Sequence, residues 1–168
     1  AVRADGRANP NQLIINKENQ KDIQELQDHL IDTHKEHFGT TDDLYVGFQL
    51  THSGRFCRPN DKKVIEPKVA YLHPVLDKKF NVTGQECVWT DAEIAGLIQN
   101  YIDAAKISHE CGAKFVDIKH CHGYLLHEFL SAHTRPGPYG GSFENRTRIL
   151  REIVKGIKSE CKGMSIGV

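Results

Sequence analysis

The sequence lacks the features that mark several classes of protein. It carries no net charge, because 22 lysine and arginine residues balance 22 aspartate and glutamate residues. A nucleic-acid partner or a charged membrane surface is therefore not indicated. No apolar run approaches the length of a membrane-spanning helix, and the polar first ten residues carry no secretion-type signal.

The cysteine patterns of disulfide frameworks and zinc modules are missing as well. The five cysteines form an odd set, and no two of them are spaced as in a CxxC motif. Reduced thiols in a cytoplasmic protein fit this pattern best. The 168 residues contain no internal repeat and no low-complexity tract, and their number suits one domain with a sizeable core.

What the sequence does contain is an alternation of helical and strand patterns. The first helix has apolar residues at spacings of three and four, Asn19 as its expected N-cap and Gly39 as its stop. A capping box formed by Thr90 and Glu93 starts a second helix. The predicted elements are helix 19–38, strand 44–50, helix 90–112, strand 115–119, helix 124–130, a long helix capped by Ser142, and a strand from Met164. This order predicts an α/β fold with parallel strands and right-handed crossovers.

Polar side chains on two predicted strands distinguish an open sheet from a barrel. Gln49 on the first strand, and Asp117 and Lys119 on the second, lie on the face opposite the helices. Strands covered by helices on both faces should be apolar throughout, so these side chains favour the upper rim of a closed β/α barrel. A complete barrel of this kind needs about 250 residues. The prediction is a partial (β/α)8 TIM barrel with parallel strands, about three β/α units in size, in which residues 1–168 form a segment of a single domain.

Groups that can donate, accept or carry protons follow the second predicted strand directly. They are Lys119, His120, His122 and Tyr124. The carboxyl ends of parallel strands are where α/β enzymes present their sites, so this stretch is the candidate active site. A structural interpretation stays open beside it: Lys119 can pair with Asp117, and His122 or Tyr124 can be packed without a ligand.

Two other functional interpretations remain open. His120 and His122 form an H-x-H pattern at a strand end, which could hold zinc in a metal-dependent TIM-barrel hydrolase. Alternatively, the chain is a barrel segment without enzymatic activity that folds only by self-association. A partial barrel leaves open strand edges and an exposed apolar face, so a homo-oligomer is expected.

Residues 51–90 form a long excursion between the first strand and the second helix, rich in charge and containing three prolines. Loops of this length in compact domains are covering loops or disordered insertions. We expect a loop over the carboxyl rim of the barrel. Within it, residues 69–72 and 86–89 can pair as a small hairpin.

Three segments together resemble the old yellow enzyme family of flavin-dependent oxidoreductases. Residues 49–55, QLTHSGR, are similar to its Q-L-x-H-x-G-R segment, and residues 117–125, DIKHCHGYL, to its (E/D)-I-H-x-A-(H/N)-G-Y-L segment. Residues 130–131 and 139–148 are similar to its L-S…Y-G-G-S-x-E-N-R-x-R pattern. The motifs occur in the family's order and cover most of the chain, with residues 56–88 the least matched.

The resemblance implies an eight-stranded β/α barrel with FMN at its carboxyl rim, of which this chain spans roughly the third to the fifth strand. It implies an NADH:flavin oxidoreductase in which NAD(P)H reduces FMN, and the flavin then reduces an activated C=C bond of a small unsaturated carbonyl-like substrate. The chain is then expected to be a segment of a longer flavoprotein, one that binds FMN weakly or not at all alone and need not be active alone.

The resemblance also assigns roles to individual residues. Gln49 matches the residue that hydrogen-bonds the flavin, and Tyr124 the residue that protonates the substrate carbon. His122 matches one of the two residues that bind the substrate carbonyl oxygen, and Lys119 stands where the second, normally His, would be. No residue is implied as a metal ligand.

Departures from the family pattern concern the substrate. His133 replaces the usual Asn, Gly137 replaces the usual Asp, and the loop before Tyr139 is shorter than usual. Lys119 in place of His exchanges a planar donor for a mobile ammonium. Lys119 could therefore polarise a carbonyl more strongly than His, or pair with Asp117 instead.

Overall fold

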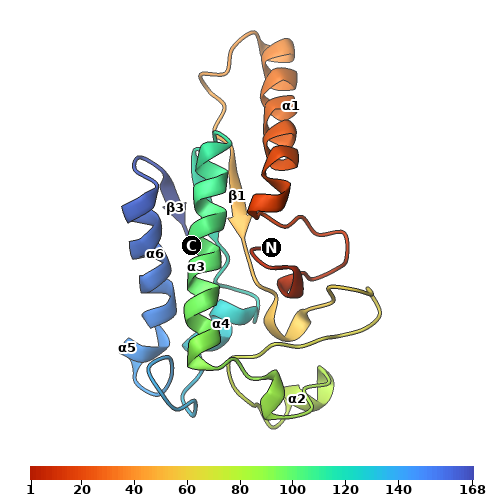
Figure 1. Ribbon diagram of the computed structural model, residues 1–168, viewed down its shortest axis with the longest axis vertical. Helices are drawn as coiled ribbons and strands as arrows, with labels where there is room; N and C mark the ends of the chain where they lie inside the picture. Colours follow the sequence, from red (N-terminus) through yellow and green to blue (C-terminus); the bar gives the residue numbers. More distant parts are fainter.

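The structure is a computed structural model that describes residues 1–168, and its elements alternate as the sequence predicts (Figure 1). The helices and strands are α1 Gln20–Phe38, β1 Gly47–Leu50, α2 Leu76–Lys79, α3 Asp91–Glu110, β2 Phe115–Ile118, α4 Leu125–Leu130, α5 Phe143–Arg146, α6 Arg148–Glu160 and β3 Ser165–Gly167. Short 3-10 turns occupy Ala4–Gly6, Lys17–Asn19, Gly54–Phe56 and Gln85–Cys87. None of the helices is both long and apolar enough to cross a lipid bilayer.

The three strands form one parallel sheet in the order β1-β2-β3, with Gln49 opposite Asp117 and Asp117 opposite Gly167. Helix α3 packs on β1 and β2, and α6 packs along α3 (Figure 1). Val116 and Ile118 turn toward these helices and are fully buried, whereas Asp117 on the opposite face is partly exposed. The strands therefore have one apolar helix-facing side and one polar side, as in the wall of a barrel.

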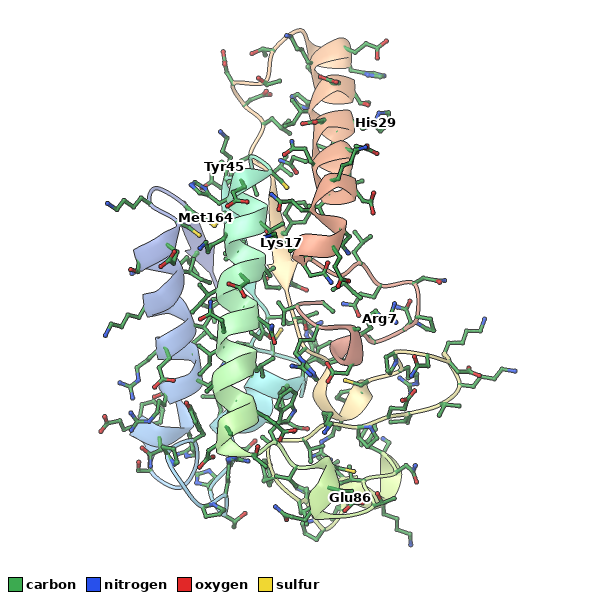
Figure 2. All side chains as sticks on the ribbon, viewed as in Figure 1. Arg7, Lys17, His29, Tyr45, Glu86 and Met164 are labelled. Atoms are coloured by element: carbon green, nitrogen blue, oxygen red, sulfur yellow. The ribbon has the colours of Figure 1, made fainter.

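A layer of side chains closes the amino end of the polar sheet face. Tyr45 stacks on Phe115 with ring centroids 5.4 Å apart, and its hydroxyl donates to Ser165 Oγ at 2.7 Å. Figure 2 labels Tyr45 near the top of the sheet. The strands point away from this layer, so their carboxyl ends lie at the opposite end, near α4 and the start of α3 (Figure 1).

The contact between α3 and α6 provides much of the core. Ile149, Ile153 and Ile157 recur on one face of α6 and are fully buried, as their spacing predicts. Gly156 lies where a β-carbon would overlap the end of the Ile102 side chain. The absence of a side chain at this position lets the two helices approach closely.

The two helix starts that the sequence marks differ in outcome. The capping box is confirmed, since Thr90 N donates to Glu93 Oε2 at 2.8 Å and Thr90 Oγ1 accepts from Glu93 N at 3.2 Å. Asn19 precedes α1 as predicted, but its side chain does not cap the helix. Instead, Asn16 Oδ1 accepts from Asn19 N at 3.1 Å. The side-chain cap therefore belongs to the 3-10 turn Lys17–Asn19 that directly precedes α1.

The predicted apolar stripe of α1 is covered only near its start. Ile23 is buried, but Leu26 and Leu30 are more than two-fifths exposed, and Phe38 is 68% exposed. The helix extends past the amino end of the sheet (Figure 1). Gly39 ends it with a φ of 75° and an N–H bond to Lys35 O of 2.8 Å, as predicted.

The predicted last helix is divided in two at Thr147. Ser142 caps the short α5, since its Oγ accepts from Asn145 N at 3.3 Å. Thr147 Oγ1 then donates to the carbonyl of Phe143 at 3.0 Å. A hydroxyl that bonds a backbone carbonyl of the preceding turn competes with the helical pattern, and α6 begins only at Arg148.

The predicted hairpin in the excursion is wrong. Residues 69 and 88 form a single parallel bridge, in which Val69 N donates to Cys87 O at 2.8 Å and Trp89 N donates to Val69 O at 3.0 Å. In a hairpin, a single reversal of the chain makes the two segments antiparallel. Here the connection through α2 reverses the chain direction twice. The two short segments therefore run in the same direction.

Candidate functional site

Gln49 and Asp117 lie side by side on the polar face of the sheet, near its carboxyl end. Gln49 Nε2 donates to Asp117 Oδ2 at 2.6 Å, and the Gln49 residue is exposed. Its amide oxygen makes no hydrogen bond within the chain, and so remains available. The next strand places Gly167 beside Asp117, where a β-carbon would come within 3.0 Å of Asp117 Oδ1. This edge of the sheet is therefore polar, open and free of bulk.

Lys119 follows β2 on the same face as Asp117. Its backbone N donates to Leu50 O at 3.0 Å, which continues the parallel pairing past the end of both strands. Its ammonium lies 3.9 Å from the ring centroid of Tyr124, a cation–π contact. Three other lysines form ion pairs within 4.0 Å, but Lys119 forms none. The pairing with Asp117 that the sequence allows is absent, and Asp117 accepts a hydrogen bond from Gln49.

Tyr124 is held between Lys119 and the excursion. It directly precedes α4 in an extended conformation, and its ring lies 5.5 Å from that of Phe56. Phe56 in turn contacts Phe80 at 4.7 Å, nearly edge to face. We call Tyr124, Phe56 and Phe80 the aromatic row. It joins two distant parts of the excursion to the end of β2.

The two histidines of the H-x-H pattern have different surroundings. His122 is exposed and has a φ of 60°, an uncommon conformation for a residue other than glycine and one that is enriched at functional sites. Its Nδ1 lies 3.1 Å from Cys121 Sγ. His120 is partly buried, with its Nε2 enclosed and unpartnered. Burial and the nearby His127 lower the pKa of His120, which favours its neutral form.

The residues that the sequence predicts for the site all follow or adjoin the carboxyl ends of β1 and β2, but they do not all contact one another. Gln49 adjoins β2 through Asp117, and Lys119 contacts Tyr124, whereas the polar contact of His122 is with Cys121. No three His, Cys, Asp or Glu side chains are grouped as a metal site requires. Within residues 1–168, no third such side chain joins His120 and His122 in one site.

A buried ion network that sequence reasoning did not find holds the excursion against α4. Arg55 donates from Nε to Glu128 and from Nη1 to Asp77 Oδ1, the latter at 3.0 Å. Glu128 Oε2 also accepts from Ala70 N at 3.0 Å. Burial raises the pKa of Glu128 to about 7, although Arg55 opposes this. Arg55 belongs to the QLTHSGR segment, but the sequence alone does not predict that it contacts Asp77 and Glu128, which lie far from it along the chain.

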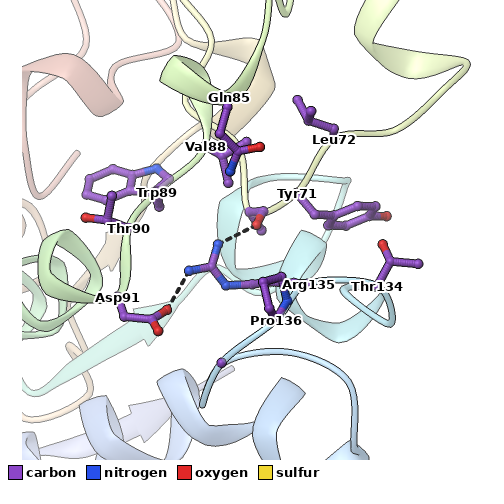
Figure 3. Close-up of a pocket in the computed structure, with 12 residues that line it drawn as sticks. Tyr71, Leu72, Gln85, Val88, Trp89, Thr90, Asp91, Thr134, Arg135 and Pro136 are labelled. Atoms are coloured by element: carbon purple, nitrogen blue, oxygen red, sulfur yellow. Dashed lines mark hydrogen bonds and ion pairs between the residues drawn. The ribbon is translucent and has the colours of Figure 1, made fainter.

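A second buried arginine closes a cavity beside the start of α3. Arg135 donates to Ala70 O and to Asp91 Oδ1, both at 2.7 Å, and Figure 3 shows it reaching across to Asp91. The cavity has a volume of about 490 Å³ and is also lined by Trp89. Because Asp91 balances the guanidinium, the wall of this cavity carries no unmatched charge.

Comparison with solved structures defines the class of fold. The chain superposes on Old Yellow Enzyme from Pichia sp. AKU4542 with a TM-score of 0.75 at 21% identity, over 98% of this chain and 44% of that one. A 2-naphthoyl-CoA reductase complex gives a TM-score of 0.72 at 23% identity, over 98% of this chain and 26% of that one. The predicted α/β fold, a partial TIM barrel with parallel strands, is confirmed.

Sequence comparison then identifies the family. Residues 1–167 match the NADH:flavin oxidoreductase / NADH oxidase family, and the chain belongs to it. An NADPH dehydrogenase of Bacillus subtilis is 33% identical over 120 residues, which are 70% of this chain and 33% of that protein. An NADH:flavin oxidoreductase of Gibberella zeae is 42% identical over 128 residues, 68% of this chain and 31% of that protein. The chain thus spans about a third of the length of these relatives.

Proposed function

We propose that this chain supplies part of the active site of an FMN-dependent NAD(P)H oxidoreductase, which reduces an activated C=C bond of unsaturated carbonyl compounds. The contact between Lys119 and Tyr124 at the carboxyl end of β2 is the observation that supports this activity most directly. It pairs a cation with a phenol that can donate a proton, in a chain that belongs to a flavin oxidoreductase family.

The residues at the sheet edge fit a flavin. Gln49 presents an exposed amide with a free oxygen, and an amide can both donate to and accept from the edge of a pyrimidine ring. Gly167 leaves the neighbouring position without a side chain that would fill the space. Gln49 is thus the residue that would hold the flavin here, and FMN, when bound, supplies the hydride for the substrate.

Lys119 and His122 would act on the substrate oxygen. Hydride addition to a conjugated carbonyl places negative charge on that oxygen, and a positioned donor stabilises such a charge by about 3–4 kcal/mol. Tyr124 would protonate the neighbouring carbon, since its phenol hydroxyl is a proton donor. Phe56 and Phe80 in the aromatic row support the proposal that the excursion 51–90 covers this rim and limits the access of water.

The test replaces the proton donor in the flavin-loaded holoenzyme. In Tyr124→Phe, reduction of the flavin by NADPH should stay unchanged, while oxidation of the reduced flavin by an enone should slow by about a hundredfold to ten-thousandfold. Stopped-flow absorbance separates these two half-reactions. Tyr45→Phe is the matched control, because it removes a phenol hydroxyl at the opposite end of the sheet. Equal enone reduction by both variants would contradict the assignment.

A further inference from the structure

The turn that connects β2 to α4 carries both His122 and Tyr124. Tyr124 N donates to Cys121 O at 3.2 Å, which closes a four-residue turn. Both central residues have positive φ, 60° at His122 and 71° at Gly123, as in a type I′ turn. Positive φ is uncommon for a residue other than glycine, and it persists where the surrounding structure holds it. The turn therefore depends on contacts from outside it.

A histidine in the first turn of α4 supplies such a contact. Gly123 N donates to His127 Nδ1 at 2.8 Å, and the hydrogen bond that closes the turn does not use this N–H. Because Nδ1 accepts the bond, it carries no proton, and the proton of the neutral ring lies on Nε2. The bond thus ties the peptide between His122 and Gly123 to a helix.

The other contacts of the turn have a different character. The ammonium of Lys119 lies on the ring of Tyr124, and a β-carbon at Gly123 would lie 3.5 Å from the Phe56 ring. Contacts with a ring face do not fix the direction of a peptide N–H, whereas a hydrogen bond at 2.8 Å does. His127 therefore orients the middle of the turn from which the Tyr124 side chain is presented.

The charges around His127 offer no substitute for this bond. The residue is exposed, and it borders a cavity of about 340 Å³ that Arg55, Lys79 and Glu128 also line. Arg55 and Glu128 pair with each other, and Lys79 is a cation. His120, at the end of β2, lies close enough for His127 to act on its charge. A second proton on the His127 ring would therefore break the bond without gaining an ion pair from these groups.

We propose that His127 is a positioning residue for proton transfer, whose neutral imidazole holds Tyr124 in place and whose protonation releases the turn. This inference rests on the proposed function and adds a pH-dependent control to it. In the protonated ring Nδ1 carries a hydrogen that faces the N–H of Gly123, so the bond is lost. Tyr124 gives its proton only when the substrate is reduced, so the effect should be confined to that half-reaction.

Two substitutions of similar shape separate the hydrogen bond from the bulk of the side chain. His127→Asn keeps an acceptor near the place of Nδ1, and its amide does not titrate. His127→Leu has the same branching without an acceptor. In the Leu variant of the flavin-loaded holoenzyme at pH 8, oxidation of the reduced flavin by an enone should slow by about threefold to tenfold, the factor by which one hydrogen bond shifts a population. The Asn variant should react like the unaltered protein.

The pH dependence distinguishes a titrating ring from a fixed acceptor. Histidine gains its second proton between pH 8 and pH 5. The rate of enone reduction by the unaltered protein should equal that of His127→Asn at pH 8 and fall about threefold to tenfold below it at pH 5. Because both proteins share His120, His122 and Lys119, titration of these groups cancels in the comparison. Stopped-flow absorbance measures this rate, and reduction of the flavin by NADPH should be the same in both proteins.

Amide hydrogen exchange at Gly123 reports the bond without turnover. In NMR of the glycine-labelled holoenzyme, this exchange should be about threefold to tenfold faster in His127→Leu than in the Asn variant or the unaltered protein. His109→Leu is the control, since His109 is an exposed histidine in the last turn of α3, by the amino end of β2. It should match the unaltered protein in every measurement. Circular dichroism and flavin absorbance establish that each variant is folded and loaded.

Unchanged enone reduction in His127→Leu would overturn the inference, as would an equal loss in His127→Asn or the same pH profile for the Asn variant and the unaltered protein. Failure of the proposed function has a different signature. In that case no protein of the set reduces the enone, while exchange at Gly123 still depends on an acceptor at position 127. That result would overturn the role in proton transfer and leave only the hold on the turn.

Discussion

Replacing Arg55 by Met removes the cation at the centre of the buried network that joins the excursion to α4. The side chain of Arg55 is 2% exposed and that of Glu128 is 6% exposed, so water cannot solvate the carboxylate that remains. Removing one partner of such a buried pair costs about 3–5 kcal/mol. We expect a loss of this size in the free energy of unfolding at pH 8.

The loss should depend on pH because Glu128 titrates. Its pKa is about 7 in the folded chain against an ordinary value of 4.5, so the folded state binds the proton more tightly. Stability therefore falls as pH rises from 4.5 through 7, by roughly 3 kcal/mol in total. Without Arg55, which favours the ionised form, the pKa rises further and the fall extends to higher pH. Near pH 5 Glu128 is protonated in both proteins, so the difference shrinks to the lost bonds of Arg55 to Glu128 and to the carboxylate of Asp77, about 1–3 kcal/mol.

Urea unfolding of the purified chain, followed by circular dichroism at pH 5 and pH 8, measures both values. Arg151→Met is the matched control, since Arg151 pairs with Glu144 at 3.7 Å on the exposed surface. It should cost between zero and about 1 kcal/mol at either pH. A loss for Arg55→Met that is the same at both pH values would refute the assignment of a buried, titrating carboxyl.

Other perturbations have equally definite outcomes. Gly156→Ala should destabilise the chain by about 1–3 kcal/mol in urea unfolding, because the added methyl overlaps Ile102. Gly96→Ala, at an exposed helical position with nothing nearby, should instead stabilise it by about 0.5–1 kcal/mol, and the same sign for both would contradict the close helix contact. Thr90→Ala removes the cap of α3 and should cost about 1 kcal/mol in the same assay. Gln49→Leu should weaken FMN binding to the holoenzyme by about fivefold to tenfold in a fluorescence titration, and unchanged binding would refute its contact with the flavin.

Features that depend on neighbouring residues could be predicted from the sequence. The capping box of Thr90 and the stop at Gly39 involve groups within four positions of each other, and both are confirmed. Strand alternation likewise assigns Gln49 and Asp117 to one face of the sheet, as the structure has them. Alternation does not fix the register between strands, so the sequence does not predict the hydrogen bond of Gln49 to Asp117 and allows Lys119 as the partner of Asp117 instead.

Features that depend on the path of the chain could not be predicted. The segments at residues 69 and 88 have strand-like composition, but their relative direction is set by the route through α2. Likewise, Arg55 and Glu128 are 73 positions apart, and either could have been solvated. The roles of His122 and Lys119 stay predictions, because their assignment needs a bound flavin and substrate.

The contacts that hold the excursion in place also affect where proteases cleave the folded chain first. Long surface segments are usually the first places to be nicked, because cleavage requires several residues to detach from the body and extend. Here three contacts tie the excursion to α4 and the residue before it: Arg55 pairs with Glu128, Ala70 N donates to Glu128, and Phe56 packs on Tyr124. Residues 39–46, which link α1 to β1, lack such buried ties. Chymotrypsin, which cleaves after aromatic residues and leucine, should therefore cut at Leu44 or Tyr45 in that link before it cuts within the excursion.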